Sequence, residues 1–496
     1  MKRKRNFISP LMKKTLLLLY HFFLVLFSKQ CLGQTDGSID PGFGIDGRIT
    51  TRIKNYATVG SIAFDAEGSI FACGHAESNG YKNYFAIAKY DHNGIQDSSF
   101  GITGVVVFDV SYVSDEEEND ILIQRDGKIL ATVGSSSIMR VYRLNKNGTL
   151  DTSFNHTGFT DAVINGVYNL SSASLQIQND NKIIICGHET VGERIFIARF
   201  NPDGRPDSSY NEDGILKLSQ GYRPLVYDSE LQHDGKLIIA GTTEDDNFFM
   251  LLRLQEDGRY DDNFGDNGKV IFQLDPSMDN IITEIELTPD NKILAAGYAS
   301  NYNSFAGIIM KFNSDGTIDS GFGENGFIYN YDCELKYFAL QADGGMLSGC
   351  GISRYIKSGE LDRKFGYNGS VYTDCYPTVI KLQADGKIIL GGMYNGEFAL
   401  ERYLNNFPGV HMNQNAIFYL YPNPFAGEIN LQFYQPLTTE IIFSISDLSG
   451  RCIRKIELDQ LESIYTIAGL DDLPTGLYFA SIQMNDMNYS YPIIKQ

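Results

Sequence analysis

Seven aspartates recur at one position of a repeated sequence unit, and carboxylates are the side chains that Ca²⁺ prefers. Each follows a turn glycine by three residues: Asp40, Asp97, Asp151, Asp207, Asp261, Asp319 and Asp362. Asp203 adds an oxygen ligand beside Asp207, so Asp203, Asp207 and Asp319 are the metal-binding residues that the sequence offers. The spacing lacks the distal Glu of an EF-hand loop. We favour the alternative, in which each Asp accepts hydrogen bonds from loop amides and fixes a turn.

Catalytic motifs are missing from the 496 residues. The chain has no Gly-x-Ser-x-Gly elbow, no His-Glu-x-x-His and no P-loop. His75 and His188 share one repeat position, which indicates duplication rather than a designed pair. We therefore predict no catalytic residue and no cofactor beyond the Ca²⁺ named above. The acidic run 115–120 is either a solvated connection or a site for a cation or basic partner.

Tyrosines in or beside loops offer a different chemistry, because an exposed ring can stack on a sugar or contact a protein. They follow second strands of the predicted units: Tyr81, Tyr84, Tyr298, Tyr302 and Tyr394. Simple packing against a strand explains them equally well.

Six cysteines follow the first 33 residues, and none has CxxC spacing. Cys73 and Cys186 share one repeat position on a predicted strand, which indicates buried filler. Cys333, Cys350 and Cys375 could yield one disulfide, and the sequence leaves the pairing open.

A repeated sequence unit positions these residues, and the first half of the unit has the pattern of a β-hairpin. Examples are 123–134 (IQRDGKILATVG) and 382–392 (LQADGKIILGG). The turn position holds only Gly or Asn, which tolerate positive φ, so we predict a two-residue type I′ turn between two strands. The second half, as in 85–104, supplies a third strand, a Gly-rich connection and a fourth strand. Its Phe is most simply a packing anchor between neighbouring units.

The count of strands favours a ring. Strand triplets number seven, and so do fourth strands, which begin at Gly47, Gly104, Gly158, Gly214, Gly268, Gly326 and Gly369. The first fourth strand (47–53) precedes every triplet, whereas the last triplet (379–404) has no successor. We therefore predict an all-β fold, a seven-bladed β-propeller closed by the N-terminal strand. The units resemble the delta-60 repeat family over about residues 35–404, which implies a propeller-like fold and no activity.

The amino end has the pattern of a signal peptide. A basic region, 2–14, precedes the apolar run 16–28, which is too short to span a bilayer, and cleavage is expected after Gly33. A membrane anchor is the alternative. The domains predicted are a signal peptide (1–33), repeats (34–404), a linker (405–415) and a C-terminal β-sandwich (416–496), with no stable membrane span in the mature protein.

The last 80 residues or so carry four motifs in order. Their residues are Tyr421, Pro422, Asn423 and Pro424, then Asp447 and Gly450, then Leu473, Pro474, Gly476 and Tyr478, and finally Lys495. This segment resembles the type A C-terminal sorting domain of the Bacteroidetes type IX (Por) secretion system. The resemblance implies Sec export to the periplasm, recognition by the type IX translocon and sorting machinery, and release or attachment at the cell surface.

The charge composition narrows the classes of partner that the protein can bind. Acidic residues outnumber basic ones by 61 to 41 and the formal net charge is −20, so nucleic acid is disfavoured as a partner. Our first hypothesis is a secreted or cell-surface binding module for a glycan or surface protein. A secreted polysaccharide hydrolase or lyase is the alternative, and a purely structural surface protein is the third.

Overall fold

The computed structural model of the chain describes most of the sequence. The described residues are 36–78, 82–110, 119–135, 137–164, 166–167, 170–189, 192–220, 222–243, 247–288, 290–301, 304–405, 418–421, 427–433, 441–447, 451–458, 464–474, 476–484 and 487–495. The fold is all-β: the strands run through the whole of this part of the chain, and the helix α2 (Asn211–Gly214) is a single turn.

The repeat region forms propeller-like antiparallel sheets of four strands each, and seven such sheets are described between residues 48 and 403. Their first strands are β2 (Tyr56–Phe64), β6 (Asn119–Ile123), β10 (Leu170–Ile177), β14 (Pro224–Leu231), β18 (Asp279–Leu287), β22 (Phe338–Leu340) and β26 (Tyr376–Leu382). The second strands are β3 (Ile70–Ser78), β7 (Ile129–Ser135), β11 (Ile183–Glu189), β15 (Leu237–Thr243), β19 (Ile293–Asn301), β23 (Met346–Ser348) and β27 (Ile388–Tyr394).

The outer half of each sheet comes from the second half of the repeat. The third strands are β4 (Lys82–Tyr90), β8 (Ile138–Leu144), β12 (Arg194–Phe200), β16 (Phe248–Leu254), β20 (Ser304–Phe312), β24 (Ile352–Tyr355) and β28 (Glu397–Tyr403). The fourth strands are β5 (Val105–Asp109), β9 (Phe159–Val163), β13 (Ile215–Ser219), β17 (Lys269–Phe272), β21 (Phe327–Asn330), β25 (Ser370–Val371) and, in the last sheet, β1 (Arg48–Thr51). Each fourth strand begins one residue after its predicted Gly.

The turn between first and second strands is not the predicted type I′ turn. In the copy at 65–68, the amide of Gly68 donates to the carbonyl of Asp65 (3.0 Å), and the amide of Asp65 donates to the carbonyl of Ser69 (3.1 Å). Only Gly68 of the turn has a positive φ, 81°. The loop is therefore a three-residue loop, a type I turn closed by one left-handed residue. Gly and Asn are selected by that single position, not by two.

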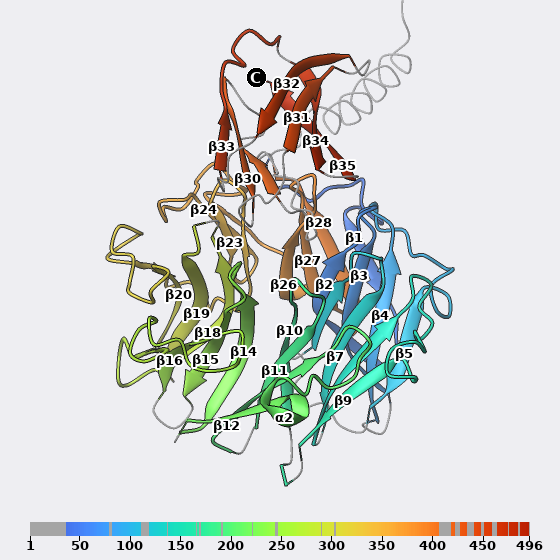
Figure 1. Cartoon of the computed structure of the whole chain (residues 1–496), viewed down its shortest axis with the longest axis vertical. Helices are drawn as coiled ribbons and strands as arrows, with labels where there is room; N and C mark the ends of the chain where they lie inside the picture. Colours follow the sequence, from blue (N-terminus) through green and yellow to red (C-terminus); the bar gives the residue numbers. More distant parts are fainter. Residues whose placement is uncertain are drawn as a thin grey trace, which may run out of the picture.

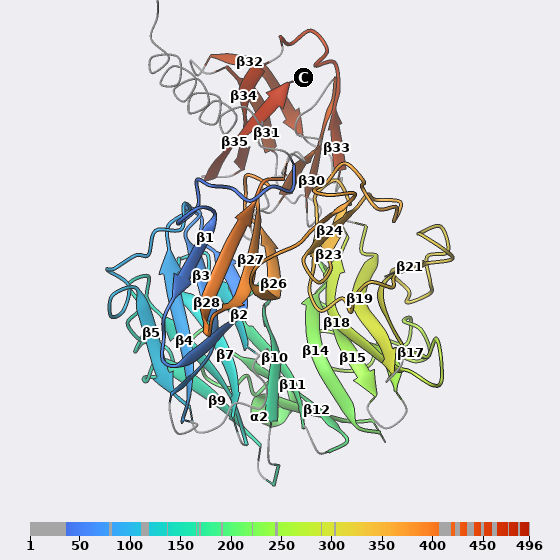
Figure 2. The same ribbon diagram turned by 180° about the vertical axis from the view of Figure 1, so that it is seen from behind.

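The amino-terminal strand pairs with the final triplet, as the strand count predicted. β1 runs antiparallel to β28, with Arg48 opposite Glu401 and Thr51 opposite Phe398. Ahead of β1, the amide of Gly37 donates to the carbonyl of Leu404 at 2.8 Å. Figure 2 shows β1 beside β28, although the two strands lie at opposite ends of the repeat region in sequence.

Neighbouring sheets bury apolar side chains between them. First strands contact one another in the order β2, β6, β10, β14, β18, β22 and β26, and β26 contacts β2. The first strands β2, β10, β14, β18 and β26 are labelled in Figure 1. The interface between the last sheet and the sheet of β2 illustrates the packing, because Val379 and Ile389 share a cluster with Val59 and Ala86. The core of the repeat region is thus divided among the interfaces between sheets.

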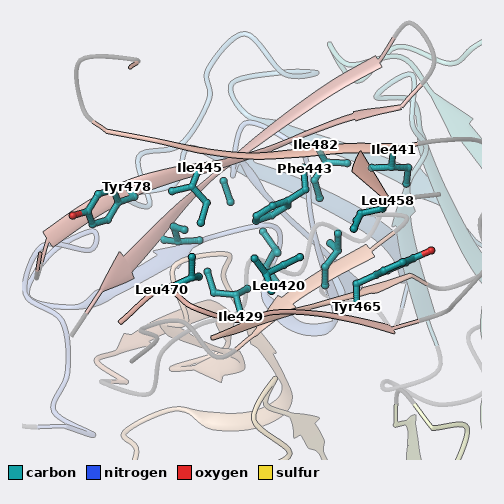
Figure 3. Packing of buried hydrophobic residues seen from close by; sticks show 14 of the residues in the cluster. Leu420, Ile429, Ile441, Phe443, Ile445, Leu458, Tyr465, Leu470, Tyr478 and Ile482 are labelled. Atoms are coloured by element: carbon teal, nitrogen blue, oxygen red, sulfur yellow. The ribbon is translucent and has the colours of Figure 1, made fainter. Parts of the chain in front are cut away.

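The C-terminal segment folds into two sheets around its own core (Figure 3). One sheet has the order β29 (Phe418–Tyr421), β30 (Ile429–Phe433), β33 (Ile464–Ile467). The other has the order β32 (Cys452–Leu458), β31 (Ile441–Ser446), β34 (Gly476–Met484), β35 (Met487–Lys495). Phe443 and Ile482 from one sheet pack with Ile429 and Leu431 from the other, which is the arrangement of the predicted sandwich.

Two predicted segments lie wholly or mainly outside the described residues. They are the signal peptide (1–33) and the linker, of which only Asn405 is described. Asn405 is buried against the repeats, where its side-chain amide donates to the carbonyl of Gly386 at 2.8 Å. Among the helical residues that the structure describes, none forms a helix long and apolar enough to cross a bilayer.

Candidate functional site

Six of the repeated aspartates lie in the loops between third and fourth strands, Asp40 lies ahead of β1, and each of the seven is paired with a basic residue. Each accepts a hydrogen bond from the backbone amide two residues later, as Asp151 does from Ser153 at 3.1 Å. Each also faces Arg or Lys on the third strand of its own sheet. These ion pairs are Arg402–Asp40 (2.9 Å), Lys89–Asp97 (2.9 Å), Arg143–Asp151 (2.8 Å), Arg199–Asp207 (2.7 Å), Arg253–Asp261 (2.8 Å), Lys311–Asp319 (3.9 Å) and Arg354–Asp362 (2.6 Å).

The residues predicted for Ca²⁺ already have cationic or amide partners. Asp207 Oδ2 also lies 3.3 Å from Lys182 Nζ, and Asp319 Oδ2 lies 2.8 Å from Lys292 Nζ. Asp203 accepts a hydrogen bond from the amide of Arg205 at 3.0 Å. This geometry favours the turn interpretation, since ammonium and guanidinium groups stand where a metal ion would bind.

The pKa values follow from these contacts. Burial by itself would raise the pKa of Asp207, but hydrogen bonds from Ser209 and the charge of Arg199 outweigh burial and lower the pKa to about 2. Among the residues that the structure describes, no three or more His, Cys, Asp and Glu side chains are grouped to hold a metal ion. Calcium binding therefore stays a prediction.

The base on the third strand also joins one sheet to the next. Arg143 lies over the ring of Phe154, 4.4 Å from its centroid, and donates to the carbonyl of Pro202 in the next repeat at 2.6 Å. Gly204 of that turn sits on the same ring, because a Cβ there would lie 2.7 Å from Phe154. Phe154 therefore packs between neighbouring units, as predicted for the Phe of the repeat. The repeated polar residues stabilise the fold.

Carboxylates on the first strands form a second polar group that the sequence analysis missed. Each accepts a hydrogen bond from a backbone amide in the first strand of the next sheet. The pairs are Asp120 with Leu175 (3.0 Å), Asp228 with Ile285 (2.9 Å) and Glu284 with Phe338 (2.6 Å). The signal was available in the repeat alignment, because Ser61 and Ser174 occupy the position that Asp120, Asp228 and Glu284 fill in other units.

One lysine faces these carboxylates. Lys381 Nζ on β26 lies 3.4 Å from Glu284 Oε1 on β18, and its charge also acts on Asp120, Asp228 and Glu286. With Glu230, which Lys381 also influences, these residues form the carboxylate cluster: Asp120, Asp228, Glu230, Glu284, Glu286 and Lys381. One ammonium group therefore acts electrostatically on five acids and forms an ion pair with Glu284.

This imbalance shifts the pKa values of the carboxylate cluster. Burial, opposed by Lys381, raises the pKa of Glu286 to about 7. Burial and the neighbouring carboxylates also raise the pKa of Asp228 and that of Glu230. The cluster can therefore hold a proton near neutral pH, a property that general acids require.

The tyrosines chosen from the sequence are covered where the structure describes them. The ring of Tyr84 lies beneath Lys54 Nζ at 4.3 Å, and the ring of Tyr394 lies beneath the guanidinium of Arg48 at 4.2 Å. Tyr298 is half-buried on β19. Tyr81 and Tyr302 lie outside the described residues. Packing is therefore the better interpretation for Tyr84 and Tyr394.

Other tyrosines are far more exposed. Tyr331 (72%), Tyr372 (92%) and Tyr376 (73%) lie in or beside the loops that precede β22 and β26. Tyr337 joins the two loops: it follows Tyr331 in the first loop and packs in one cluster with Cys375 of the second. We name Tyr331, Tyr372 and Tyr376 the tyrosine edge. Asp374, between the last two, is exposed and pairs with Arg48 at 2.6 Å.

The histidines do not add to a site. Nδ1 of His188 accepts a hydrogen bond from the amide of Val226 (3.2 Å), and burial lowers the pKa of His188 to about 4. His75 pairs with Asn83 at 3.0 Å. Cys73 and Cys186 are buried on β3 and β11, in agreement with the filler interpretation. Of the acidic run, 115–118 lie outside the described residues, and Asp120 belongs to the carboxylate cluster.

Several residues of the sorting motif have structural roles. Leu473 and Tyr478 belong to the C-terminal core, and the hydroxyl of Tyr478 donates to the carbonyl of Pro474 at 2.7 Å. Asp447 closes a turn by accepting a hydrogen bond from the amide of Arg451 at 3.1 Å. Gly476 begins β34, Lys495 ends β35, and Tyr421 ends β29. Pro422, Asn423, Pro424 and Gly450 lie outside the described residues.

Comparison with solved structures gives distant similarities. A crystal structure of Sqt1 from Chaetomium thermophilum is 12% identical with a TM-score of 0.42, covering 77% of this chain and 97% of its own. The polysaccharide lyase Uly1 is 8% identical with a TM-score of 0.36, covering 83% and 90%. A glucose dehydrogenase is 12% identical with a TM-score of 0.33, covering 48% and 77%. None of the curated proteins compared with the chain matches it.

Family comparison is more specific. Residues 124–154, 178–210, 232–264 and 288–322 match a β-propeller family described as a domain of unknown function, DUF5122. Residues 419–496 match the secretion system C-terminal sorting domain. Both resemblances found in the sequence are thereby confirmed. The chain combines repeats of this β-propeller family with a C-terminal sorting domain of the type IX secretion system.

Proposed function

We propose that this chain is an exported, closed seven-bladed propeller that acts as a binding module at the cell surface or outside the cell. Handling by the type IX secretion system follows from the sorting domain. Entry into the periplasm through the Sec pathway, directed by residues 1–33, is part of the proposal. Fractionation of cells producing the full chain tests it, because a block of Sec export should retain the chain with its leader in the cytoplasm.

Closure is supported by contacts at both ends of the repeat region. β1 completes the last sheet, and the amide of Gly366 donates to the carbonyl of Asp36 at 3.0 Å. Arg354 reaches both ends of the repeat region, since it pairs with Asp36 (2.5 Å) and Asn405 (2.7 Å). A ring removes the exposed sheet edges that an open array would leave.

The exposure of the tyrosine edge is the observation that carries the binding proposal. A ring that is largely exposed can stack on the apolar face of a sugar. The exposed carboxylate of Asp374 lies between Tyr372 and Tyr376 in sequence, where it can accept hydrogen bonds from hydroxyl groups. A glycan is therefore the ligand class that this edge fits best, with a surface protein as the second partner class.

Binding of soluble polysaccharides by the mature chain, residues 34–496, tests this proposal. Xylan, laminarin and alginate are suitable probes in calorimetry, each with and without Ca²⁺. Replacing Tyr331, Tyr372 and Tyr376 by Ala should weaken binding at least tenfold. Tyr367→Ala is the matched control, because Tyr367 is 83% exposed but precedes β25, whereas Tyr372 follows it. Equal affinity for all variants would reject the tyrosine edge as the site.

The carboxylate cluster favours a second function, a polysaccharide hydrolase or lyase. Such enzymes use a carboxyl group that is protonated near neutral pH, and Glu286 has a pKa of about 7. The mature chain should then release reducing ends or unsaturated sugars from one of these polysaccharides. Glu286→Gln should abolish that release while leaving calorimetric binding intact. Activity that survives Glu286→Gln would reject this role.

A further inference from the structure

Two of the three cysteines whose pairing the sequence left open are brought together. Cys333 is buried in the loop that precedes β22, and Cys350 is exposed in the connection between β23 and β24. Burial and the neighbouring thiol of Cys350 raise the pKa of the Cys333 thiol. Cys350 Sγ also lies 3.9 Å from the carbonyl oxygen of Glu334, the neighbour of Cys333. Two cysteines that approach one another from separate loops in this way are what a disulfide needs.

The third thiol has a different partner. Cys375 is buried, and burial together with the neighbouring carboxylate of Glu401 raises the pKa of its thiol. Tyr337 packs in one cluster with Cys375 and donates a hydrogen bond to the carbonyl of Gly351, the neighbour of Cys350, so Cys375 lies near the pair. Cys73 and Cys186 lie on strands of other sheets, and Cys452 belongs to the C-terminal domain.

The sheet next to this thiol pair is the smallest of the repeat region. β22 and β23 have three residues each, β24 has four and β25 has two. The connection that carries Cys350 is held by few ladder bonds, and Gly349 there has a φ of 140°. A covalent bond between Cys333 and Cys350 would fix this connection to the loop that enters the sheet.

We propose that Cys333 and Cys350 form a disulfide in the exported protein, an inference that rests on passage through the oxidising periplasm. The exposed thiolate of Cys350 attacks the disulfide of a thiol-oxidising protein, forms a mixed disulfide and expels one thiolate of the oxidant. Cys333, as thiolate, then attacks Cys350 Sγ and expels the second thiolate. Two protons leave the chain, and two electrons reduce the oxidant's disulfide to a dithiol.

Peptide mapping of the full chain, produced with its leader and purified from the periplasm without reductant, tests the pairing. Free thiols are blocked with N-ethylmaleimide under denaturing conditions before digestion. We expect one peptide pair that links Cys333 to Cys350, whereas Cys73, Cys186, Cys375 and Cys452 carry the label. A link from Cys375 to either residue, or label on Cys333 and Cys350, would overturn the proposal.

Thermal unfolding gives an independent readout. Reductant should lower the Tm of the oxidised chain by a few degrees, about 2–6 °C. Cys350→Ser should show the lower Tm without reductant and no further fall with it, and Cys375→Ser should keep the sensitivity to reductant. If the chain is not exported, oxidised glutathione added to reduced chain from the cytoplasm replaces the oxidant. Failure of export and failure of pairing are then separate results.

Discussion

Two adjacent sheets of the repeat region are built from similar sequence but are held together differently. In the sheet β18–β21, the first three strands have nine residues each, whereas the strands of the sheet β22–β25 have two to four. The long sheet has Lys311 at the position of the paired base, 3.9 Å from Asp319. The short sheet has Arg354 there, and Arg354 bonds to Asp362, Asp36 and Asn405.

This difference indicates how a repeat tolerates a shortened member. Backbone ladders supply most hydrogen bonds in a sheet, and a ladder of two or three pairs supplies few. In the short sheet, side chains take over: the hydroxyl of Ser348 donates to the carbonyl of Tyr337 (2.6 Å), and that of Tyr337 donates to the carbonyl of Gly351 (2.6 Å). The short sheet should therefore depend more on single side chains.

Replacement of Arg354 has the largest expected effect. Arg354→Leu leaves the carboxylates of Asp362 and Asp36 without their common partner, and Arg354 is almost fully buried. We expect a loss of about 3–5 kcal/mol in the free energy of unfolding, measured in urea. Lys311→Leu, the matched change in the long sheet, should cost about 1 kcal/mol, because its ion pair is longer and weaker. Equal losses in the free energy of unfolding would show that a sheet with short strands does not depend more on this ion pair than a sheet with long strands.

Removal of one hydroxyl tests the same dependence on a smaller scale. Tyr337→Phe leaves the carbonyl of Gly351 without its donor, for an expected loss of about 1–2 kcal/mol. Tyr329→Phe on β21 is the control, since Tyr329 is half-exposed at the edge of the long sheet. That change should stay within about 0.5 kcal/mol. An equal loss of unfolding free energy for Tyr329→Phe and Tyr337→Phe would contradict the greater dependence of the short sheet on single side chains.

The periodic features were predictable from sequence because the same physical demand acts in every unit. A single left-handed position selects Gly or Asn, so hairpins could be placed, although the turn type was wrong. The starts of fourth strands and the pairing of β1 with β28 followed from counting. The Phe anchors were predictable because each follows the repeated Asp by three residues, with Tyr210 in place of Phe in one unit.

The features that break the period were predictable only as positions in the repeat, and their neighbours in space were not. The carboxylate cluster depends on which first strands lie near Lys381, and that proximity exists only after the sheets assemble. Exposure of Tyr372 and Tyr376 likewise depends on how the loop before β26 turns. The thiol pair required the contact between two loops, which spacing alone does not give.

The long sheet also differs in its response to alkaline pH. β18 carries Glu284 and Glu286, whereas β22 carries no carboxylate. The pKa of Glu286 is about 7 in the fold and lies near 4.5 in the unfolded chain, so ionisation costs stability as the pH rises between these values. Glu286→Gln should therefore raise the free energy of unfolding by about 1 kcal/mol at pH 8, and hardly change it at pH 4. A loss at pH 8 would mean that the ionised carboxylate has a stabilising partner.

Acidification should have the smallest effect on stability, and it should destabilise both sheets. The hydrogen bond from Lys292 lowers the pKa of Asp319, and although burial would raise the pKa of Asp362, Arg354 lowers it. Stability from these groups is complete above the unfolded pKa, near 3.9, and is lost as the pH falls through the lower folded values. Melting between pH 5 and pH 3 should show Asp319→Asn losing about 0.5–1 kcal/mol less than the unsubstituted chain. If stability depended on pH in the same way in both proteins, Asp319 would have the same pKa in the folded and unfolded chain. Its ion pairs would then contribute nothing to the stability of the long sheet.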